Sequence, residues 1–480
     1  MRPSLTRRDL LVAAGLGAAA LAAPGSARAR AAHGRAATPG AAAFVTEPSL
    51  RPPTMRVTTS AGPSPGFLFV ASLNGPGQRG PMIVDNRGEV VWFRPVESFA
   101  VDFRRQVFAG KQVLTWWEGQ ITNGVGVGEG VIVDQRYVPI ARVRAGNGFD
   151  ADVHEFLLTP RRTALLTIYK SVPADLSSVG GPAAGQVLDS IVQEVDIASG
   201  RVLFEWHSLE HVALGESYAP LLDPFDYFHI NSVDVDLDGN LVVSARNTSA
   251  VYKIDRASGQ VMWRLGGRNS DFDLGPGADF MYQHDARAHT NGTLTLFDNG
   301  PSQTTKQSRA IRLGLDHVER RAYLLQQYRH PTELESTAMG NAQVLDGDSV
   351  LVGWGTEPWV TEFGPGGEVR FDATFDGGAW NYRAFRLPWV GRPTARPKVV
   401  ARRSPGGLTV YASWNGSTET AYWQVLAGET RERLTRVKTA TAAGFETVVR
   451  MRGRPRFVAV TALDRRRVAL ARSPVVAPRR

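Results

Sequence analysis

The sequence predicts an all-β protein: a six-bladed β-propeller over residues 51–395, followed by a small immunoglobulin- or fibronectin-like β-sandwich over residues 396–480. Two observations predict the propeller: a strand–turn–strand pattern recurs along residues 52–395, and the 3.6-residue periodicity of helices is nearly absent there. The sandwich is predicted by a change after Pro393, where seven short apolar segments alternate with polar turns. A seven-bladed ring is the alternative for the first domain.

The repeated unit is an apolar strand, a tight polar turn and a second strand. Its six copies are Ile83–Trp92, Val131–Ile140, Glu194–Leu203, Lys253–Trp263, Ile311–His317 and Thr361–Val369. Another strand pair precedes most copies, which gives about four strands per unit, the size of a propeller blade. Ring closure removes free sheet edges, so the first and last segments are expected to share a blade, with Tyr382–Trp389 as the closing strand.

Composition narrows the classes of function. The chain has no cysteine, which excludes disulfides and thiolate chemistry. Its net charge of +9 is concentrated at the ends: residues 1–30 hold five Arg against one Asp, and residues 397–480 hold 17 Lys and Arg against five acidic residues. The remaining middle is net acidic, which argues against a nucleic-acid-binding propeller. For the basic C-terminal domain, contact with a cell surface is one interpretation and a solvated charged face is the other.

Residues 1–30 are predicted to be a twin-arginine export signal. Arg7 and Arg8 precede an apolar run from Leu10 to Ala23, and an Ala-Arg-Ala cleavage site follows at residues 27–29. The run is shorter than the ~20 apolar residues of a membrane span, and an uncleaved anchor is the alternative. Residues 31–50 are expected to be a flexible lead-in. We therefore expect a protein that is exported by the twin-arginine route and is secreted or held at the cell surface.

Three histidines occupy one recurring position, near the start of the first strand of three successive blades. His154 lies in Asp-Val-His-Glu-Phe, His229 in Tyr-Phe-His-Ile-Asn, and His284 in Tyr-Gln-His-Asp-Ala-Arg. The first strands of all blades line one central channel, so equivalent positions should converge on its axis. Side chains two residues apart on a strand share a face, so Asn231 is expected to share the direction of His229.

Two arginines are expected near these histidines. Arg246 ends the strand that pairs with the strand of Asn231, and Arg287 follows His284 by three residues. Imidazoles with an arginine and an amide suit a tetrahedral oxyanion, because a guanidinium binds phosphate- or sulfate-like oxygens in a bidentate manner. A neutral histidine can also carry a transferred group while other histidines exchange protons.

Three other interpretations stay open at this point. Convergent histidines can bind zinc, as in a metal-dependent hydrolase or lyase, although Glu155 and Asp285 each adjoin a histidine and should point away from it. The end of the central channel where the histidines meet could also bind a ligand or a partner without catalysis. The histidines could also do no more than complete hydrogen bonds along the channel. The oxyanion interpretation itself predicts no metal.

Several ordered segments resemble the arylsulfotransferase family. They are Asp223–Val233, Ile254–Gly267, Tyr282–Arg287, Leu296–Gly300, Gly340–Val344 and Tyr382–Trp389. The family's fold is a six-bladed propeller, which agrees with the repeat count. The chain is most similar to the short actinobacterial and fungal branch, because it lacks the extra N-terminal domain and the disulfide of Gram-negative periplasmic members. It differs at one motif, with Arg246-Asn247 where the family often has Arg-His.

The resemblance implies transfer of a sulfuryl group from an aryl sulfate ester to a phenol. The reaction would be ping-pong through a sulfohistidine at His284, without the adenylyl-sulfate cofactor PAPS or any other cofactor. The catalytic residues would be His284, His229, Arg246 and His154. The substrate-binding candidates are Asn231, Arg287 and Thr337. The implied partners are small-molecule aryl sulfates and phenols.

Overall fold

The computed structural model describes residues 39–300 and 307–479. The export signal expected in residues 1–30 and the first part of the lead-in, residues 31–38, lie outside the described residues. The described chain folds into eight β-sheets, and its helices are four single turns of 3-10 helix. No helix among these residues has the length and apolar character that would carry it across a membrane.

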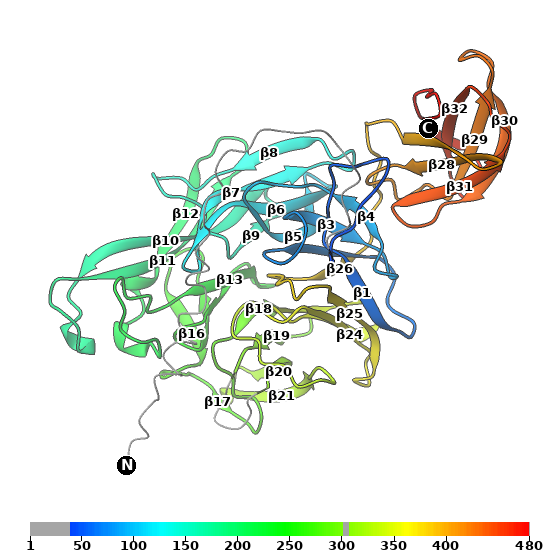
Figure 1. The fold of residues 1–480 in the computed structure, drawn as a ribbon. Coiled ribbons are helices and arrows are strands. Elements are labelled where there is room, and N and C mark those ends of the chain that lie inside the picture. The colour runs from blue at the N-terminus through cyan, green and yellow to red at the C-terminus, as the bar shows by residue number, and fades with distance from the viewer. Residues whose placement is uncertain (1–38, 301–306, 480) are drawn as a thin grey trace.

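Six sheets follow one another along residues 55–387 and fan around a common centre (Figure 1). Sheet 1 contains β26 (Phe385–Leu387), β2 (Phe67–Ser72), β3 (Gly80–Val84) and β4 (Val90–Phe93), in that order. Sheet 2 contains β5 (Phe99–Phe108), β6 (Lys111–Thr122), β7 (Val125–Val133) and β8 (Pro139–Val143). Sheet 3 contains β9 (Phe156–Leu158), β10 (Thr163–Ala174), β11 (Gly185–Asp196) and β12 (Val202–His207).

The next three sheets repeat the up-and-down antiparallel order. Sheet 4 contains β13 (Ile230–Val235), β14 (Leu241–Ala245), β15 (Ala250–Ile254) and β16 (Val261–Gly266). Sheet 5 contains β18 (His284–Ala288), β19 (Thr293–Asp298), β20 (Arg309–Asp316) and β21 (Arg321–Tyr328), to which β17 (Asp273–Leu274) adds in parallel. Sheet 6 contains β22 (Asn341–Val344), β23 (Val350–Gly353), β24 (Trp359–Phe363) and β25 (Val369–Phe375), with β1 (Met55–Ser60) on its outer edge.

The six copies of the sequence repeat form the hairpins between the third and fourth strands of the six sheets. In each of the first two hairpins an aspartate, Asp85 or Asp134, accepts hydrogen bonds from two backbone N–H groups of its own turn. Asp316 does the same in the fifth hairpin, the copy whose pattern has degenerated most in the sequence. A short acceptor side chain stabilises such a turn, and this explains why aspartate recurs at this position.

An apolar cluster fills the space between each pair of neighbouring sheets. Trp92 and Trp116 lie in the cluster between sheets 1 and 2, and Trp206 and Tyr252 lie between sheets 3 and 4. A cluster that contains Phe371 joins sheet 6 to sheet 1. The segment expected to close the ring contributes β26, which pairs with β2, while β1 from the other end pairs with β25. The molecule is therefore all-β and propeller-like.

Three of the strands nearest the centre contain or directly follow a kinked residue. Asp102, His229 and Asp285 have φ angles of 55°, 56° and 57°, and the strand pairing shifts register beside each of them. A left-handed residue inside a strand pair produces a bulge, and a bulge changes the direction in which the neighbouring side chains point. Simple alternation of faces therefore does not describe the side chains at this end of the sheets.

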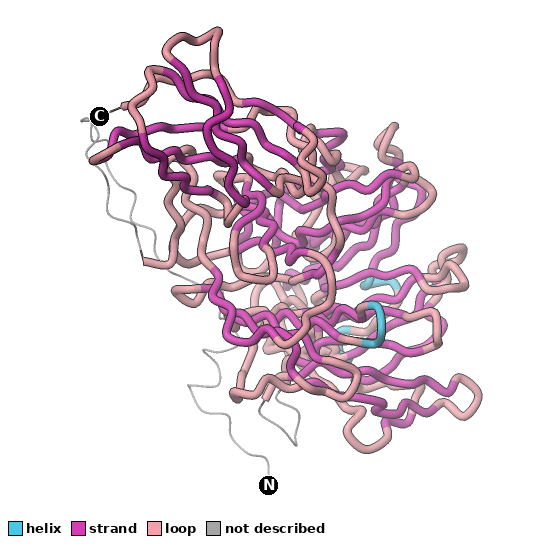
Figure 2. The backbone as a smooth tube through the Cα atoms, turned by 90° about the vertical axis from the view of Figure 1, so that its right-hand side faces the viewer, coloured by secondary structure: helices cyan, strands magenta, loops and turns pink. Residues whose placement is uncertain are grey.

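Residues 398–472 form two further sheets that stand apart from the first six (Figures 1 and 2). One sheet contains β27 (Lys398–Ser404), β28 (Gly407–Ser413) and β31 (Glu446–Arg452). The other contains β30 (Thr435–Thr441), β29 (Tyr422–Gly428), β32 (Phe457–Leu463) and β33 (Ala469–Arg472). A single apolar cluster belongs to both sheets and includes Trp423, whereas Trp414 packs against its margin. All seven strands coincide with apolar segments predicted from the sequence.

Residues 41–50, which were expected to belong to a flexible lead-in, contact the C-terminal sheets. The ring of Phe44 lies 4.1 Å from that of Phe445, measured between centroids, and Lys398 forms an ion pair with Glu47. The Glu446 carboxylate accepts hydrogen bonds from the Thr46 N–H and hydroxyl. The composition of residues 31–50 predicted flexibility, but Phe44, Thr46 and Glu47 fit the surface of the C-terminal sheets. We call residues 41–50 the strap.

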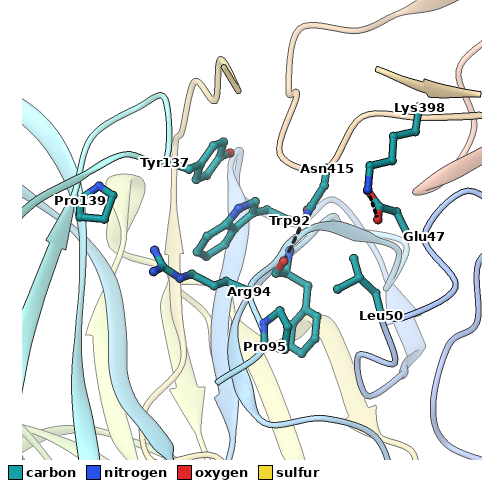
Figure 3. Close-up of a pocket in the computed structure, with 10 residues that line it drawn as sticks. Glu47, Leu50, Trp92, Arg94, Pro95, Tyr137, Pro139, Lys398 and Asn415 are labelled. Carbon is teal, nitrogen blue, oxygen red and sulfur yellow. Dashed lines mark hydrogen bonds and ion pairs between the residues drawn. The ribbon is translucent and has the colours of Figure 1, made fainter. Parts of the chain in front are cut away.

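A cavity of about 470 Å³ lies where sheet 1, the strap and the C-terminal sheets meet (Figure 3). Trp92 and Arg94 from the first sheet and its following loop line it, opposite Asn415. The Asn415 amide accepts from the N–H of Phe93 and donates to its carbonyl, in the manner of a strand neighbour. None of the three repeated histidines lines this cavity, which belongs to the junction between the two parts of the chain.

Candidate functional site

The three repeated histidines are brought together at the central ends of sheets 3, 4 and 5. His154 lies just before β9, His229 lies just before β13, and His284 is the first residue of β18. The rings of His154 and His229 are 5.1 Å apart between centroids and meet edge to face. His284 is near enough for the charges of both to act on its pKa. The convergence predicted from the repeat is thus present in the structure.

Two of the imidazoles are held by carboxylates. The Nδ1 atom of His154 lies 2.5 Å from Oδ2 of Asp152, and that of His229 lies 2.5 Å from Oδ2 of Asp226. A carboxylate at Nδ1 fixes the orientation of the ring and stabilises its protonated form. Both rings can therefore present Nε2 as the atom that gains or loses a proton. Tyr169 packs against both rings, at centroid distances of 5.5 and 5.6 Å.

The third imidazole has a neutral partner. Nδ1 of His284 lies 2.7 Å from Oδ1 of Asn299, and the backbone N–H of Met339 donates to Nε2 at 3.2 Å. His284 is 2% exposed. Burial lowers its pKa well below the ordinary value of 6.5, and the positive charge of Arg246 lowers it further. At neutral pH His284 is therefore an uncharged imidazole with a lone pair on Nε2.

Burial also lowers the pKa of His229, but here a carboxylate opposes the effect more strongly than the amide does at His284. Burial lowers the pKa of the His229 imidazole, while the Asp226 carboxylate raises it, and the net effect is a lowered pKa. The contrast with His284 arises from the partner: His229 has a carboxylate that favours its charged form, and His284 has only an amide.

Arg246 supplies the positive charge of the site. Its guanidinium donates to the Asn247 side chain at 2.8 Å and to the Thr337 carbonyl at 3.3 Å, and it lies over the ring of Tyr282 at 4.7 Å. Within residues 39–300 and 307–479, Arg246 forms no ion pair with a carboxylate. Burial lowers its pKa, and the charge of the Asp226 carboxylate, which is not ion-paired with it, offsets this only in part. Such a guanidinium is suited to bind an anion.

Two of the predicted substrate-binding residues, Asn231 and Thr337, lie beside this cluster. Asn231 is fully buried, and its Nδ2 donates to the Gln283 carbonyl at 2.7 Å, while its Oδ1 has no partner among the described residues. Thr337 is exposed and meets Arg246 through its backbone carbonyl, so its main chain rather than its hydroxyl contacts the site.

Arg287 is not brought into the histidine cluster. Its guanidinium donates to Glu155 at 2.6 Å and to Asp285 at 2.8 Å, on the other side of the strands. Arg383 from the closing segment pairs with the same two carboxylates and also with Asp102. These buried ion pairs fill the centre beneath the histidines. Glu155 and Asp285 therefore point away from their neighbouring histidines.

Sequence reasoning missed the three residues that hold the imidazoles. Asp152 and Asp226 lie two and three positions before their histidines, so proximity in sequence could have indicated them. Asn299 lies 15 residues after His284 and reaches it because β18 and β19 pair, with His284 opposite Phe297. Only the register of these two strands predicts that contact.

The histidine cluster is not arranged as a metal site. Among the residues that the structure describes, no group of three or more His, Asp and Glu side chains is placed to hold a metal ion. The Nε2 atom of His284 also accepts from the Met339 N–H. The arrangement instead combines an uncharged imidazole, two carboxylate-supported imidazoles and a guanidinium without an ion-paired carboxylate. These are the parts that group transfer of an oxyanion requires.

Comparisons with known proteins show the family to which the chain belongs. A family model for arylsulfotransferase (ASST) matches residues 104–376. Among solved structures, the chain is similar to a protein of unknown function from Bacteroides caccae, at 13% identity over 67% of this chain and 98% of that chain, with a TM-score of 0.41. It is also similar to virginiamycin B lyase from Staphylococcus aureus (8% identity, 76% and 96% covered, TM-score 0.34) and to the Dos1 propeller (12% identity, 70% and 72% covered, TM-score 0.32). No curated protein matches. Because the family model spans more than half of the 480 residues, the chain belongs to the arylsulfotransferase (ASST) family.

Proposed function

We propose that the protein is an aryl sulfotransferase that moves a sulfuryl group from an aryl sulfate ester to a phenol, in two steps and without PAPS. The observation that carries the proposal is the pairing of a buried, uncharged His284 with Arg246, a guanidinium that has no counter-ion among the described residues. The first supplies a nucleophile, and the second supplies a binding site for the sulfate oxygens.

In the first step, the lone pair on Nε2 of His284 forms a bond to sulfur. The bond between sulfur and the aryl oxygen breaks, and its electron pair leaves with that oxygen. His154, whose Nδ1 is held by Asp152, donates a proton to the departing phenolate. Arg246 balances the negative charge on the sulfuryl oxygens throughout the step.

In the second step, a phenolic acceptor replaces the departed phenol. The imidazole that gave up its proton now accepts the phenolic proton, and the acceptor oxygen attacks sulfur as the bond to Nε2 breaks. The cycle therefore returns every proton to its starting place and needs no external cofactor. This balance supports a ping-pong reaction through a sulfohistidine.

We also propose that sheets 1–6 are the blades of a closed six-bladed propeller and that the two C-terminal sheets form a sandwich of the immunoglobulin or fibronectin type. The apolar clusters between neighbouring sheets, with sheet 6 packed on sheet 1, support the ring. The single core shared by a three-stranded and a four-stranded sheet supports the sandwich. In such a ring the histidine site lies at one mouth of the channel.

We propose that the protein is exported by the twin-arginine route and is secreted or held at the cell surface. The Arg7-Arg8 pair ahead of a short apolar run supports this location. Replacing both arginines by lysine is expected to leave the protein inside the cells that produce it. Equal amounts of exported wild type and variant, measured by immunoblot of fractions, would contradict the proposed route.

The test of the proposed activity uses p-nitrophenyl sulfate with and without phenol. Intact-mass spectrometry is expected to detect one added sulfuryl group without phenol, and nitrophenol release should accelerate when phenol is added. His284→Ala is expected to abolish both signals. His289→Ala is the matched control, because His289 is also partly buried with a pKa lowered to about 4, but it hydrogen-bonds to Thr295 and not to the cluster.

No adduct and no phenol-dependent release in the wild type would overturn the proposal and leave ligand binding without catalysis. Release that survives in His284→Ala would move the nucleophile to another residue. Release that requires added zinc and gives no adduct would favour a metal-dependent hydrolase instead.

A further inference from the structure

Asn299 connects the proposed nucleophile to the loop that covers it. It follows β19 directly and is 1% exposed. Its Nδ2 donates to the carbonyls of Ser336 and Met339, both at 3.0 Å. Both amide hydrogens are therefore in use on one side of the side chain. The side-chain oxygen, which can only accept, is left facing Nδ1 of His284 at 2.7 Å.

This arrangement determines the tautomer of His284. An amide oxygen accepts but does not donate, so Nδ1 must carry the proton and Nε2 must carry the lone pair. The contact on the other side of the ring agrees, because the Met339 N–H donates to Nε2 at 3.2 Å and needs an acceptor there. Two independent partners thus require the same tautomer.

The loop around Met339 is held in place from several directions. Met339 and Gly340 have φ angles of 66° and 98°. A Cβ on Gly340 would lie 2.5 Å from the Phe297 ring, so only glycine allows this approach to β19. Arg246 donates to the Thr337 carbonyl in the same loop. The N–H that contacts Nε2 is therefore placed by β19 and by the anion-binding arginine together.

We infer that Asn299 is a positioning residue that makes Nε2 of His284 the sulfuryl acceptor, and that the Met339 N–H is the donor that transfers from this nitrogen to a sulfuryl oxygen. The inference rests on the proposed sulfotransferase function. In the free protein the N–H caps the lone pair. When sulfur approaches, the Met339 hydrogen bond to Nε2 breaks, and the same N–H bonds an oxygen of the incoming group.

The same pairing explains how the transferred group leaves again. As the bond between Nε2 and sulfur forms, the ring becomes positive and its Nδ1–H becomes more acidic. Asn299 stabilises this proton by accepting a hydrogen bond from it but is too weak a base to remove it. A ring that keeps this proton is a good leaving group when the phenol attacks. A carboxylate in this place would accept the proton and make the N–S bond harder to break.

The first test measures the tautomer directly in the wild-type protein. Nitrogen-15 NMR of histidine-labelled protein, with His284 assigned from the spectrum of His284→Gln, is expected to show a protonated Nδ1 and an unprotonated Nε2. The opposite tautomer would overturn the inference. This measurement requires neither substrate nor activity, so it tests the tautomer independently of the proposed function.

The second test uses Asn299→Asp, with sulfuryl adduct followed by mass. A carboxylate at Nδ1 is expected to raise the pKa of His284 by about 1 to 3 units. The acidic limb of adduct formation should shift upward by that amount, and the adduct should persist longer when phenol is added. Asn381→Asp is the control for a carboxylate introduced at a buried asparagine away from the histidines: Asn381 accepts from the Ala71 N–H, and its Nδ2 has no partner among the described residues.

The outcomes separate the two proposals. A wild type without adduct refutes the sulfotransferase function. If the wild type forms the adduct, and if the pH profile and adduct lifetime of Asn299→Asp match those of Asn381→Asp, only the role of Asn299 is refuted. A purely structural role of Asn299 would lower the amount of active protein but would leave the pH profile unchanged.

Discussion

At the scale of single residues, the partner of each imidazole distinguishes three chemically identical side chains. Aspartates hold Nδ1 of His154 and of His229, whereas an asparagine amide holds Nδ1 of His284, whose pKa is lowered by burial and by the charge of Arg246. The sequence repeat predicted that the histidines would meet. It did not predict their different roles, because those depend on Asp152, Asp226 and Asn299, none of which occupies a common repeat position.

The Asp152 carboxylate is predicted to support proton transfer by His154. Asp152→Asn keeps the shape but removes the charge, and transfer from a phenyl sulfate with a basic leaving group should slow by about 10²-fold. Transfer from p-nitrophenyl sulfate should slow less, since nitrophenolate leaves without a proton. Steady-state rates with both donors measure the difference. Asp150→Asn, an exposed aspartate two positions earlier, is the control, and an equal loss with both donors would contradict the prediction.

The lowered pKa of His284 predicts the pH dependence of the first step. A histidine whose pKa is depressed stays uncharged as pH falls below its ordinary value of 6.5, so the nucleophile is lost only at the depressed pKa. Single-turnover adduct formation is therefore expected to have its acidic midpoint below pH 6.5. A midpoint at or above 6.5 would mean that burial does not control this group.

At the scale of strands, bulges explain where sequence reasoning about the site succeeded and where it did not. Asn231 was expected to share the direction of His229 because alternate residues share a face. His229 is left-handed, however, and the pairing of β13 shifts between Ile230 and Ser232, so alternation does not apply there. Arg287 was expected near the histidines, but its guanidinium joins the buried ion pairs with Glu155 and Asp285 instead. The residue pattern of a single sequence does not predict where these kinks occur.

The closing segment is predicted to brace the strands that hold two of the histidines. The Tyr382 hydroxyl lies within hydrogen-bond distance of the carbonyls of His154 and Asn231, at 3.2 and 3.1 Å. Tyr382→Phe should lower the free energy of unfolding by about 1 kcal/mol, because it leaves a buried carbonyl without a donor. Chemical denaturation measures this change.

Tyr328→Phe is the matched control for that brace. Tyr328 is also buried, but its hydroxyl has no hydrogen-bond partner among the described residues, so its removal should cost nothing or be slightly stabilising. Equal destabilisation by the two substitutions would show that the Tyr382 hydroxyl has no bracing role.

At the scale of the whole molecule, the sequence predicted the elements better than their connections. Hairpins are encoded locally, by an aspartate or glycine turn between apolar strands, and all six appear in the structure. Contacts between distant segments have no such local signal. Residues 41–50 were predicted to be flexible because the whole segment 31–50 is rich in Ala, Gly and Pro, and only the surface around Phe445 and Glu446 shows what they contact.

The strap is therefore predicted to hold the C-terminal sheets on the propeller-like body. Glu446 accepts from the N–H of Val45 at 3.1 Å and from the N–H and hydroxyl of Thr46 at 2.6 and 2.5 Å. Hydrogen bonds to a charged acceptor contribute about 1.5 to 3 kcal/mol each, so Glu446→Ala should release residues 41–50 before the rest of the fold opens. Hydrogen exchange of this segment should accelerate by at least about tenfold, the ratio that corresponds to 1.4 kcal/mol.

The same variant separates attachment from catalysis. The strap lies at the junction between the two parts of the chain, and neither it nor Glu446 contacts the three histidines, Asn299 or Arg246 in the described residues. Glu446→Ala should therefore form the sulfuryl adduct at the wild-type rate while its strap exchanges faster. Glu429→Ala removes an exposed acidic residue from the same domain and should change neither property. A loss of adduct formation in Glu446→Ala but not in Glu429→Ala would mean that the C-terminal domain acts on the site through the strap, and attachment would then be part of the catalytic structure.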